Sequence, residues 1–112
     1  MTPRHTTYYN IPMEEIDITI SKLIWDDWNI EHIAHHEVTT EEVEASLADT
    51  NAIYLKAKRG RVMVLGRTGS RLVTTVMNQQ KNPQEFYIIT SRDMSKKERA
   101  YYREQLERSR YE

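Results

Sequence analysis

The sequence predicts an α+β domain, in which helices pack on one face of a twisted antiparallel sheet of about four strands. The chain has 112 residues, of which 38% are hydrophobic, so it suits a single domain with one two-layer core. Segments with strand or helix periodicity follow one another in the order β-α-α-β-β-β-β-α. Short turns join the later strands, which should therefore be antiparallel neighbours.

The beginning of the chain combines a polar arm, an extended segment and a short helix. Residues 1–15 are mostly polar and are expected to form a flexible arm that precedes a domain of residues 16–112. Isoleucine then alternates with polar residues in 16–20, which predicts a strand with one apolar face that can continue through Leu23 and Ile24 to Trp25. Asp26 or Asp27 is placed to accept a backbone N–H and so to cap a short helix.

Two further helices begin with capping boxes, in which a hydroxyl residue is followed three positions later by glutamate. Thr39 and Glu42 have this spacing, and the helix that they open should end near residues 49–51. Ser95 and Glu98 repeat the spacing and open a helix at the carboxy terminus. Apolar residues recur four positions apart in both segments, so each helix should pack through one stripe.

Four more segments are rich in β-branched and aromatic residues and are expected to be strands. They span residues 53–57, 61–67, 71–78 and 86–91. Glycine-containing turns separate the first three, whereas a polar loop precedes the fourth. Because side chains alternate along a strand, Arg61, Met63 and Arg67 should project to the same face.

The composition excludes several classes of protein. There is no cysteine, which excludes disulfides, thiolate zinc sites and cysteine nucleophiles. No stretch approaches the ~20 apolar residues of a membrane span, and residues 1–10 lack the apolar run of a signal peptide. We therefore expect a cytoplasmic protein that does not engage a membrane.

Charge is divided unevenly along the chain, although the formal net charge is only −1. Residues 1–55 hold two basic and eleven acidic side chains, whereas residues 56–112 hold fourteen basic and six acidic ones. Such an asymmetry indicates that one surface meets a polyanion, while the other meets a basic partner or is solvated. The alternative is that the two halves interleave in space and their fields cancel.

Arginines near the ends of the predicted strands are candidates for binding phosphate. They are Arg59, Arg61, Arg67, Arg71 and Arg92. A guanidinium offers phosphate a planar fork of donors and keeps its charge, as a phosphodiester and its more negative transition state require. The alternative interpretation is a solvated rim of charges around the sheet.

Three histidines, His32, His35 and His36, lie within about one helical turn. His32 and His36 could share a helix face and bind one metal ion, but no cysteine and no His-Glu-x-x-His run completes such a site. We therefore expect neither a metal nor another cofactor. Histidine both accepts and donates protons near neutral pH, so one of the three is a candidate proton carrier.

The carboxy-terminal helix is basic and is interleaved with tyrosines. Its cations are Lys96, Lys97, Arg99, Arg103, Arg108 and Arg110. Cations that alternate with aromatic rings suit single-stranded RNA, because charge follows the backbone while rings stack on bases. The alternative is an amphipathic helix that packs Tyr102 and Leu106 on the sheet, and the two interpretations are compatible.

Four pieces of the chain, in order, resemble the BrnT family, the ribonuclease toxins of bacterial type II toxin–antitoxin modules. They are Trp25-Asp26, the run from His32 to Val38 with Thr40-Glu41-Glu42, the hairpin from Val64 to Leu72, and the run from Ile88 to Tyr102. The last piece is the most specific, because it joins a strand, an arginine, a capped helix and a tyrosine at fixed spacing. The chain has His32, His35 and Glu37 where the family has asparagine, lysine and glycine.

The resemblance implies that residues 16–112 form a BrnT-like toxin domain with a RelE-like fold, which cuts RNA without a metal. It also implies a partner, a small DNA-binding antitoxin that covers the basic face of the toxin and represses the shared operon. Neither the resemblance nor the residues fix the oligomeric state.

In the predicted reaction the 2′-hydroxyl of the RNA attacks the adjacent phosphate. We assign proton transfer to His36 and phosphate charge to Arg67 and Arg92. Tyr102 is assigned to positioning or stacking, and Glu98 is expected to be a cap rather than a base. Further contacts with nucleic acid are assigned to Arg61, Arg71, Lys97, Arg99 and Arg103. Arg92→Ala should slow cleavage about 100-fold or more and leave the fold intact.

Two other functions stay open. The first is a catalytically inactive toxin-like domain that binds an antitoxin or nucleic acid, which the departures at His32, His35 and Glu37 motivate. The second is a stand-alone structural or regulatory domain, such as a homodimer that pairs through an exposed strand edge.

Overall fold

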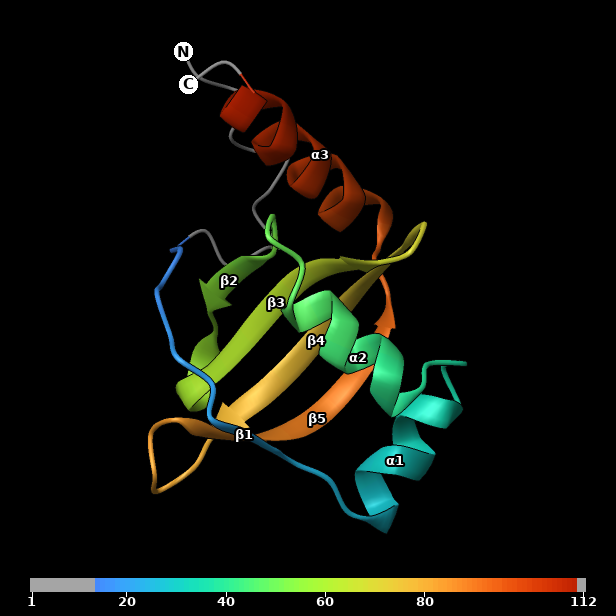
Figure 1. The fold of residues 1–112 in the computed structure, drawn as a ribbon, viewed down its shortest axis with the longest axis vertical. Helices are drawn as coiled ribbons and strands as arrows, with labels where there is room; N and C mark the ends of the chain where they lie inside the picture. The colour runs from blue at the N-terminus through green and yellow to red at the C-terminus, as the bar shows by residue number, and fades with distance from the viewer. Residues whose placement is uncertain (1–13, 111–112) are drawn as a thin grey trace.

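In the computed structural model, which describes residues 14–110, a twisted five-stranded sheet carries helices on both faces (Figure 1). The elements in chain order are β1 (Lys22–Ile24), α1 (Asp27–Ala34), α2 (Thr40–Leu47), β2 (Ile53–Lys56), a 3₁₀ turn (Lys58–Gly60), β3 (Arg61–Thr68), β4 (Arg71–Gln79), β5 (Glu85–Asp93) and α3 (Lys96–Arg110). The predicted α+β class is confirmed. Within the described residues, no helix is long and apolar enough to cross a membrane.

The strand order is β1-β5-β4-β3-β2, and three of the four pairings are antiparallel. The exception is β1, which runs parallel to β5 with Leu23 opposite Phe86. The prediction of an entirely antiparallel sheet of about four strands is therefore wrong at this edge. Parallel neighbours need a long connection, and the helices and three strands between β1 and β5 supply it.

The first part of the predicted first strand is instead an extended strap, residues 14–21, that crosses the sheet from the β2 edge to the β5 edge (Figure 1), whereas the predicted continuation through Leu23 and Ile24 is a strand, β1. The Ile16 N–H donates to the Tyr54 carbonyl at 2.9 Å, and the Ser21 N–H donates to the Gln84 carbonyl at 2.8 Å. The isoleucines of the strap pack on the core, as their alternation predicted. Residues 14–16 pair with β2, but the rest of the strap runs across the strands, and β1 is the next segment to join the sheet.

The last two residues of the predicted flexible arm of residues 1–15 pair with β2. Glu15 forms an antiparallel bridge with Leu55, and the Lys56 N–H donates to the Glu14 carbonyl at 2.9 Å. The rest of the arm, residues 1–13, lies outside the described residues.

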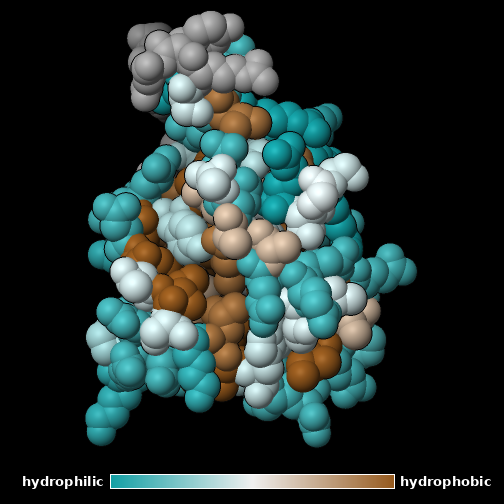
Figure 2. All heavy atoms as spheres, viewed as in Figure 1, coloured by the Kyte–Doolittle hydropathy of each residue, from teal (hydrophilic) through white to brown (hydrophobic). Residues whose placement is uncertain are grey.

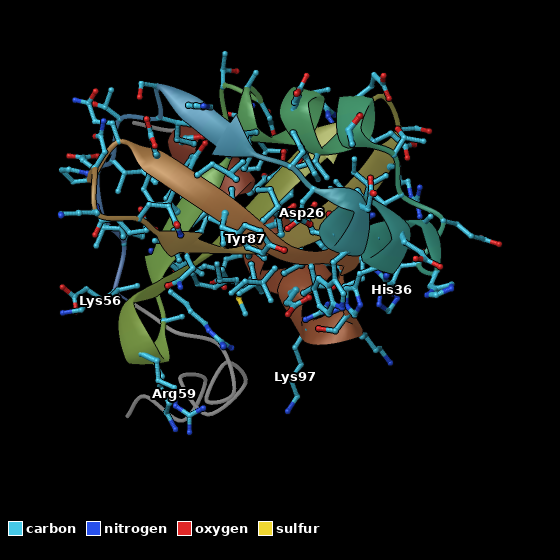
Figure 3. The ribbon with its side chains drawn as sticks, turned by 90° about the horizontal axis from the view of Figure 1, so that it is seen from below. Asp26, His36, Lys56, Arg59, Tyr87 and Lys97 are labelled. Atoms are coloured by element: carbon cyan, nitrogen blue, oxygen red, sulfur yellow. The ribbon has the colours of Figure 1, made fainter. Side chains whose placement is uncertain are left out.

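Side-chain alternation along β3 divides the core in two. Val62 and Val64 join a cluster with residues of α1, α2, β4 and β5. Leu65 joins a second cluster with Tyr101 and Tyr102 of α3. The prediction that all helices share one face is therefore wrong: α1 and α2 cover one face, and α3 packs on the other at one end of the sheet (Figures 1 and 3). The physical reason is that β3 is apolar on both faces.

The predicted capping boxes are present. The Glu42 N–H donates to Thr39 Oγ1 at 3.1 Å, and the Thr39 N–H donates to the Glu42 carboxylate at 3.0 Å. The same pair of bonds opens α3, where the Glu98 N–H donates to Ser95 Oγ at 3.1 Å and the Ser95 N–H donates to Glu98 at 2.8 Å. Asp26 caps α1. These bonds satisfy N–H groups that have no partner within the helix.

Two backbone positions restrict which side chain can be present. Gly66 of β3 lies so close to α2 that a Cβ atom there would overlap the Ser46 carbonyl oxygen. Glu37, after α1, has φ of 61°, in the left-handed region that favours glycine. The Val38 N–H donates to the Ile33 carbonyl at 3.0 Å and closes the helix end. This conformation explains why the glycine of the BrnT pattern suits the position.

Candidate functional site

The sheet register places Arg67 and Arg92 on the sheet face that carries α3, which we call the α3 face. Directly paired residues of antiparallel strands project to the same side, and Leu65, Thr74 and Arg92 are paired in succession across β3, β4 and β5. Leu65 packs against α3, and Arg67 lies two residues further along β3. Two arginines that are distant in the sequence therefore share one face.

Asp49 joins Arg67 to the hydroxyl end of Tyr102. Tyr102 Oη donates to Asp49 Oδ2 at 2.7 Å, and the backbone N–H of Arg67 donates to the same oxygen at 3.0 Å. Burial of Tyr102, together with the hydrogen bond and the charge of Asp49, raises its pKa to about 12, although the nearby Arg67 charge lowers it. The phenol therefore keeps its proton at neutral pH.

The guanidinium of Arg67 is exposed, and within residues 14–110 it has no hydrogen-bond partner or counter-ion. The ring of Tyr102, in contrast, is only 2% exposed. Stacking on a base, one of the two roles predicted for Tyr102, needs an accessible ring, so the structure leaves positioning as the role open to it. Sequence reasoning missed Asp49, because an aspartate just after a helix resembles an ordinary helix end.

Arg92 is paired with Glu98. Its Nη1 and Nη2 atoms donate to the two carboxylate oxygens of Glu98 at 2.8 and 3.0 Å, in the bidentate geometry that gives strong bonds. Thr74 Oγ1 donates to the same carboxylate at 2.8 Å. Burial raises the pKa of Glu98, but the hydrogen bonds from Arg92, the Ser95 N–H and Thr74 outweigh it and leave the pKa below its usual value.

Because of this pairing, a substitution of Arg92 would affect the stability of the protein as well as any contact with phosphate. Glu98 is 5% exposed, so Arg92→Ala would leave a buried carboxylate without its counter-charge. Removing one partner of such a pair is strongly destabilising. We therefore expect Arg92→Ala to lower stability as well as remove a cation, whereas the predicted capping role of Glu98 is confirmed.

Arg71 lies on the opposite face of the sheet, where it fastens the connection between α1 and α2. Its guanidinium forms ion pairs with Asp93 at 2.8 Å and with Glu42 at 3.2 Å. It also donates to the backbone carbonyls of His36 at 3.3 Å and Glu37 at 2.6 Å. The hydrogen bond to Asp93 raises the pKa of Arg71 further. The structure thus separates Arg71 from the other arginines predicted to contact nucleic acid.

His36 lies just beyond α1, in the connection to α2 (Figure 3). Its ring meets His32 edge-on with ring centroids 5.5 Å apart, and His32 stacks on Trp28 at 4.8 Å. Within residues 14–110, no hydrogen bond or ring contact joins His36 to Arg67 or Arg92. In the same part of the chain, no group of three potential metal-binding side chains is close enough to hold an ion.

The remaining residues predicted to contact nucleic acid lie on α3 and at the far end of β3. Lys97 and Arg103 are exposed on α3, and Lys97 extends away from the body of the domain (Figure 3). Arg99 is half-buried, and its Nη1 donates to the Met94 carbonyl at 2.7 Å. Arg61 is exposed on the α3 face at the opposite end of β3 from Arg67.

Comparison with known proteins finds a likeness to a solved structure. No family model matches the chain, and neither does any curated protein. Among solved structures, the chain is similar to the ribonuclease toxin BrnT of Brucella abortus, with 23% sequence identity and a TM-score of 0.54. The match covers 70% of this chain and 100% of that one. The predicted BrnT-like fold is therefore confirmed.

Proposed function

We propose that this chain is the ribonuclease toxin of a type II toxin–antitoxin module and that RNA binds to its α3 face. The observation that carries the proposal is the exposed side chain of Arg67, which has no counter-ion within residues 14–110, while the backbone N–H of the same residue is held by Asp49 and, through it, by Tyr102. A phosphodiester would neutralise this cation, and Lys97 and Arg103 extend the positive charge along α3. The BrnT-like fold supports the same function, because the neighbour with that fold is a ribonuclease toxin.

The cleavage that we propose needs no metal. A base takes the proton of the RNA 2′-hydroxyl, and the oxygen attacks the adjacent phosphorus. The bond to the 5′-oxygen then breaks, and that oxygen takes up a proton. The products are a 2′,3′-cyclic phosphate and a 5′-hydroxyl. Arg67 would stabilise the negative charge that develops on the phosphorane, where one well-placed donor contributes ~3 kcal/mol.

His36 is the proton carrier in this proposal, because its ring is exposed and its backbone carbonyl is held by Arg71. His36 lies with Arg71 on the face opposite Arg67, so the RNA has to pass around the β5 edge, beyond the residues that β1 covers, for one phosphate group to meet both side chains. Tyr102 and Asp49 act as positioning residues, because their hydrogen bonds tie the backbone of Arg67 to α3.

The partner that we propose is a DNA-binding antitoxin that covers the α3 face and competes with RNA. A surface that binds the phosphates of RNA is basic, so an inhibitor of that surface would present acidic side chains to it. We place both interactions in the cytoplasm, where RNA and operator DNA are accessible.

A second function is favoured by one observation. Arg92, the other arginine assigned to phosphate, is already neutralised by Glu98. If the transition state has only Arg67 to stabilise its charge, the domain could bind RNA or an antitoxin without cleaving. Purified chain that shifts RNA in a gel but never shortens it would favour this alternative.

Expression in a bacterial host tests the proposal. The parent chain should arrest growth, and co-expression of the neighbouring reading frame should relieve the arrest. Arg67→Ala should also relieve it, whereas the matched control Lys81→Ala, which removes an exposed cation from the loop between β4 and β5, should remain toxic. Arrest that persists in Arg67→Ala at equal protein level would contradict the role of Arg67.

A further inference from the structure

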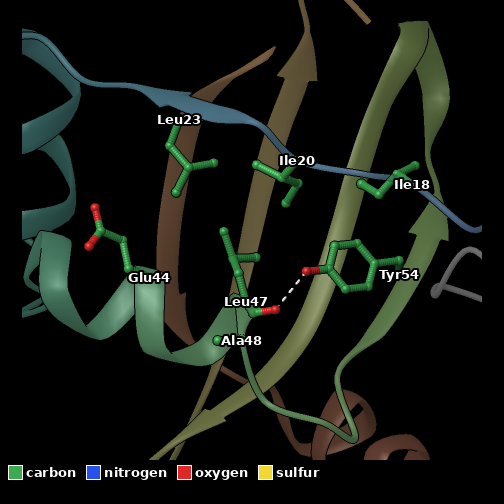
Figure 4. Close-up of a pocket in the computed structure, with 7 residues that line it drawn as sticks. All are labelled: Ile18, Ile20, Leu23, Glu44, Leu47, Ala48 and Tyr54. Atoms are coloured by element: carbon green, nitrogen blue, oxygen red, sulfur yellow. Dashed lines mark hydrogen bonds between the residues drawn. The ribbon is translucent and has the colours of Figure 1, made fainter. Parts of the chain in front are cut away.

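An apolar groove lies on the face opposite α3, between the strap, α2 and β2 (Figure 4). Its volume is about 300 Å³. The lining is formed mainly by half-buried apolar side chains, Ile18, Ile20, Leu23, Leu47 and Tyr54. The Tyr54 hydroxyl donates to the Leu47 carbonyl at 2.8 Å, so this polar group of the lining has a partner within the fold. Figure 2 shows an apolar strip on this face, bordered by hydrophilic side chains.

The surroundings of the groove are acidic. Residues 14–55, which form the strap, β1, α1, α2 and the beginning of β2, contain eleven acidic side chains and one lysine, although two of the acids, Glu15 and Asp49, bond to α3 instead. Helix α2 has three glutamates and no basic residue, and its exposed Glu44 lines the groove. Arg71, which reaches this face from β4, is neutralised by Glu42 and Asp93. The groove therefore combines an apolar floor with a negative border.

We propose that this groove docks a positively charged segment of another protein, which inserts an aliphatic side chain between the strap and α2. Charge complementarity selects a basic partner, and the apolar floor gives one anchoring side chain a desolvated site. The groove and the α3 face lie on opposite sides of the sheet, so the partner and RNA can be bound at the same time. This inference does not depend on ribonuclease activity.

A second copy of the chain is the less suitable occupant. None of the exposed cations of the described residues lines the groove, and several of them, such as Arg67, Lys97 and Arg103, lie on the α3 face, so a copy would have to place such a surface against the groove of the next. Such a head-to-tail contact does not close as a dimer, and it generates rings or filaments. It would also cover the surface that we assign to RNA.

Two exposed alanines of one helical region allow a matched test. Ala48 lines the groove, whereas Ala45 lies three residues earlier in α2 and does not. The probe is a fluorescein-labelled helical peptide of lysine and alanine that carries two leucines four residues apart, measured by fluorescence anisotropy with the full chain. Ala48→Arg should weaken binding by about tenfold or more, and Ala45→Arg by less than about threefold. Equal weakening by both variants would overturn the proposal, because charge alone would then explain it.

A control peptide and a second variant test the apolar anchor and the negative border separately. Replacing both leucines of the peptide by serine should abolish binding at the same peptide concentration, and undiminished binding of this control would contradict an apolar anchor. Glu44→Lys should weaken binding of the leucine peptide about tenfold. This variant tests the negative border alone, because it leaves the apolar floor of the groove unchanged. Failure of the parent chain to bind the leucine peptide overturns the proposal. So does self-association in sedimentation that Ala48→Arg abolishes, because a second copy would then be the occupant.

Discussion

Replacing Glu98 with glutamine should lower the free energy of unfolding by about 2 kcal/mol at pH 7. Removing one partner of a buried ion pair costs about 3–5 kcal/mol. The Arg92 side chain is 36% exposed, however, and water would solvate part of its unpaired charge, which reduces the cost. Glutamine keeps the shape and one acceptor for the capping bond to Ser95. At roughly 4–8 °C per kcal/mol for a domain near this size, the melting temperature should fall by roughly 10 °C.

Urea unfolding of parent and variant between pH 3 and 7 measures this effect. Because folding lowers the pKa of Glu98, its charge stabilises the protein above the ordinary glutamate pKa of about 4.3, and this contribution is lost as pH falls through the lower folded value. The difference between parent and variant should thus be constant near neutral pH and shrink in acid. Glu31→Gln, at an exposed position of α1, should change stability by less than about 0.5 kcal/mol. Equal stability of Glu98→Gln and the parent, or a difference that does not begin to shrink as pH falls below the ordinary glutamate pKa, would refute the reasoning.

Three further predictions concern backbone conformation and the tyrosine site. Glu37→Gly should raise the midpoint of urea unfolding and stabilise the chain by about 1 kcal/mol, because it relieves a left-handed residue; a lower midpoint would contradict this. Gly66→Ala should destabilise the chain by about 2 kcal/mol or more in the same assay, because the new methyl group meets the Ser46 carbonyl; a neutral result would show that α2 moves freely. The raised pKa of Tyr102, about 12, means that folding binds its proton more tightly, so this stabilisation is complete below pH 10 and is lost as pH rises toward 12. Tyr102→Phe should therefore lose less stability than the parent between pH 10 and 12. Equal losses would show that folding does not raise the pKa of Tyr102.

Local signals in the sequence predicted most of the secondary structure. Both capping boxes are made of bonds between residues three apart, so Thr39 with Glu42 and Ser95 with Glu98 could be recognised without knowing the rest of the fold. Alternation also predicted correctly that Arg67 shares a face with Met63. The strap shows what alternation does not predict, which is the path of the backbone across the sheet. Its alternation records that one side is buried, but it does not record whether the backbone lies beside a strand or across several.

The site depends on contacts between distant residues, which the sequence did not reveal. Nothing near Asp49 indicates that it reaches Tyr102, 53 residues away, because that contact follows from where α3 packs. Arg71 projects to the face opposite Arg67 because it is paired with Thr68, the residue after Arg67 in β3. Pairing of Arg92 with Glu98 was within reach, since the two are six residues apart on either side of a predicted helix start. The carboxylate of Glu98 accepts the capping bond from the Ser95 N–H and a second bond from Arg92.

Mapping the ends of cleaved RNA tests the central claim most directly. Purified chain, incubated with 5′-labelled RNA in the presence of a metal chelator, should leave 2′,3′-cyclic phosphate ends, and deoxy substitution at the cleaved nucleotide should block the reaction. Arg67→Ala should slow cleavage about 100-fold, while Lys81→Ala cleaves at the parent rate. Products that end in a 3′-hydroxyl, or an Arg67→Ala variant as fast as the parent, would contradict the account.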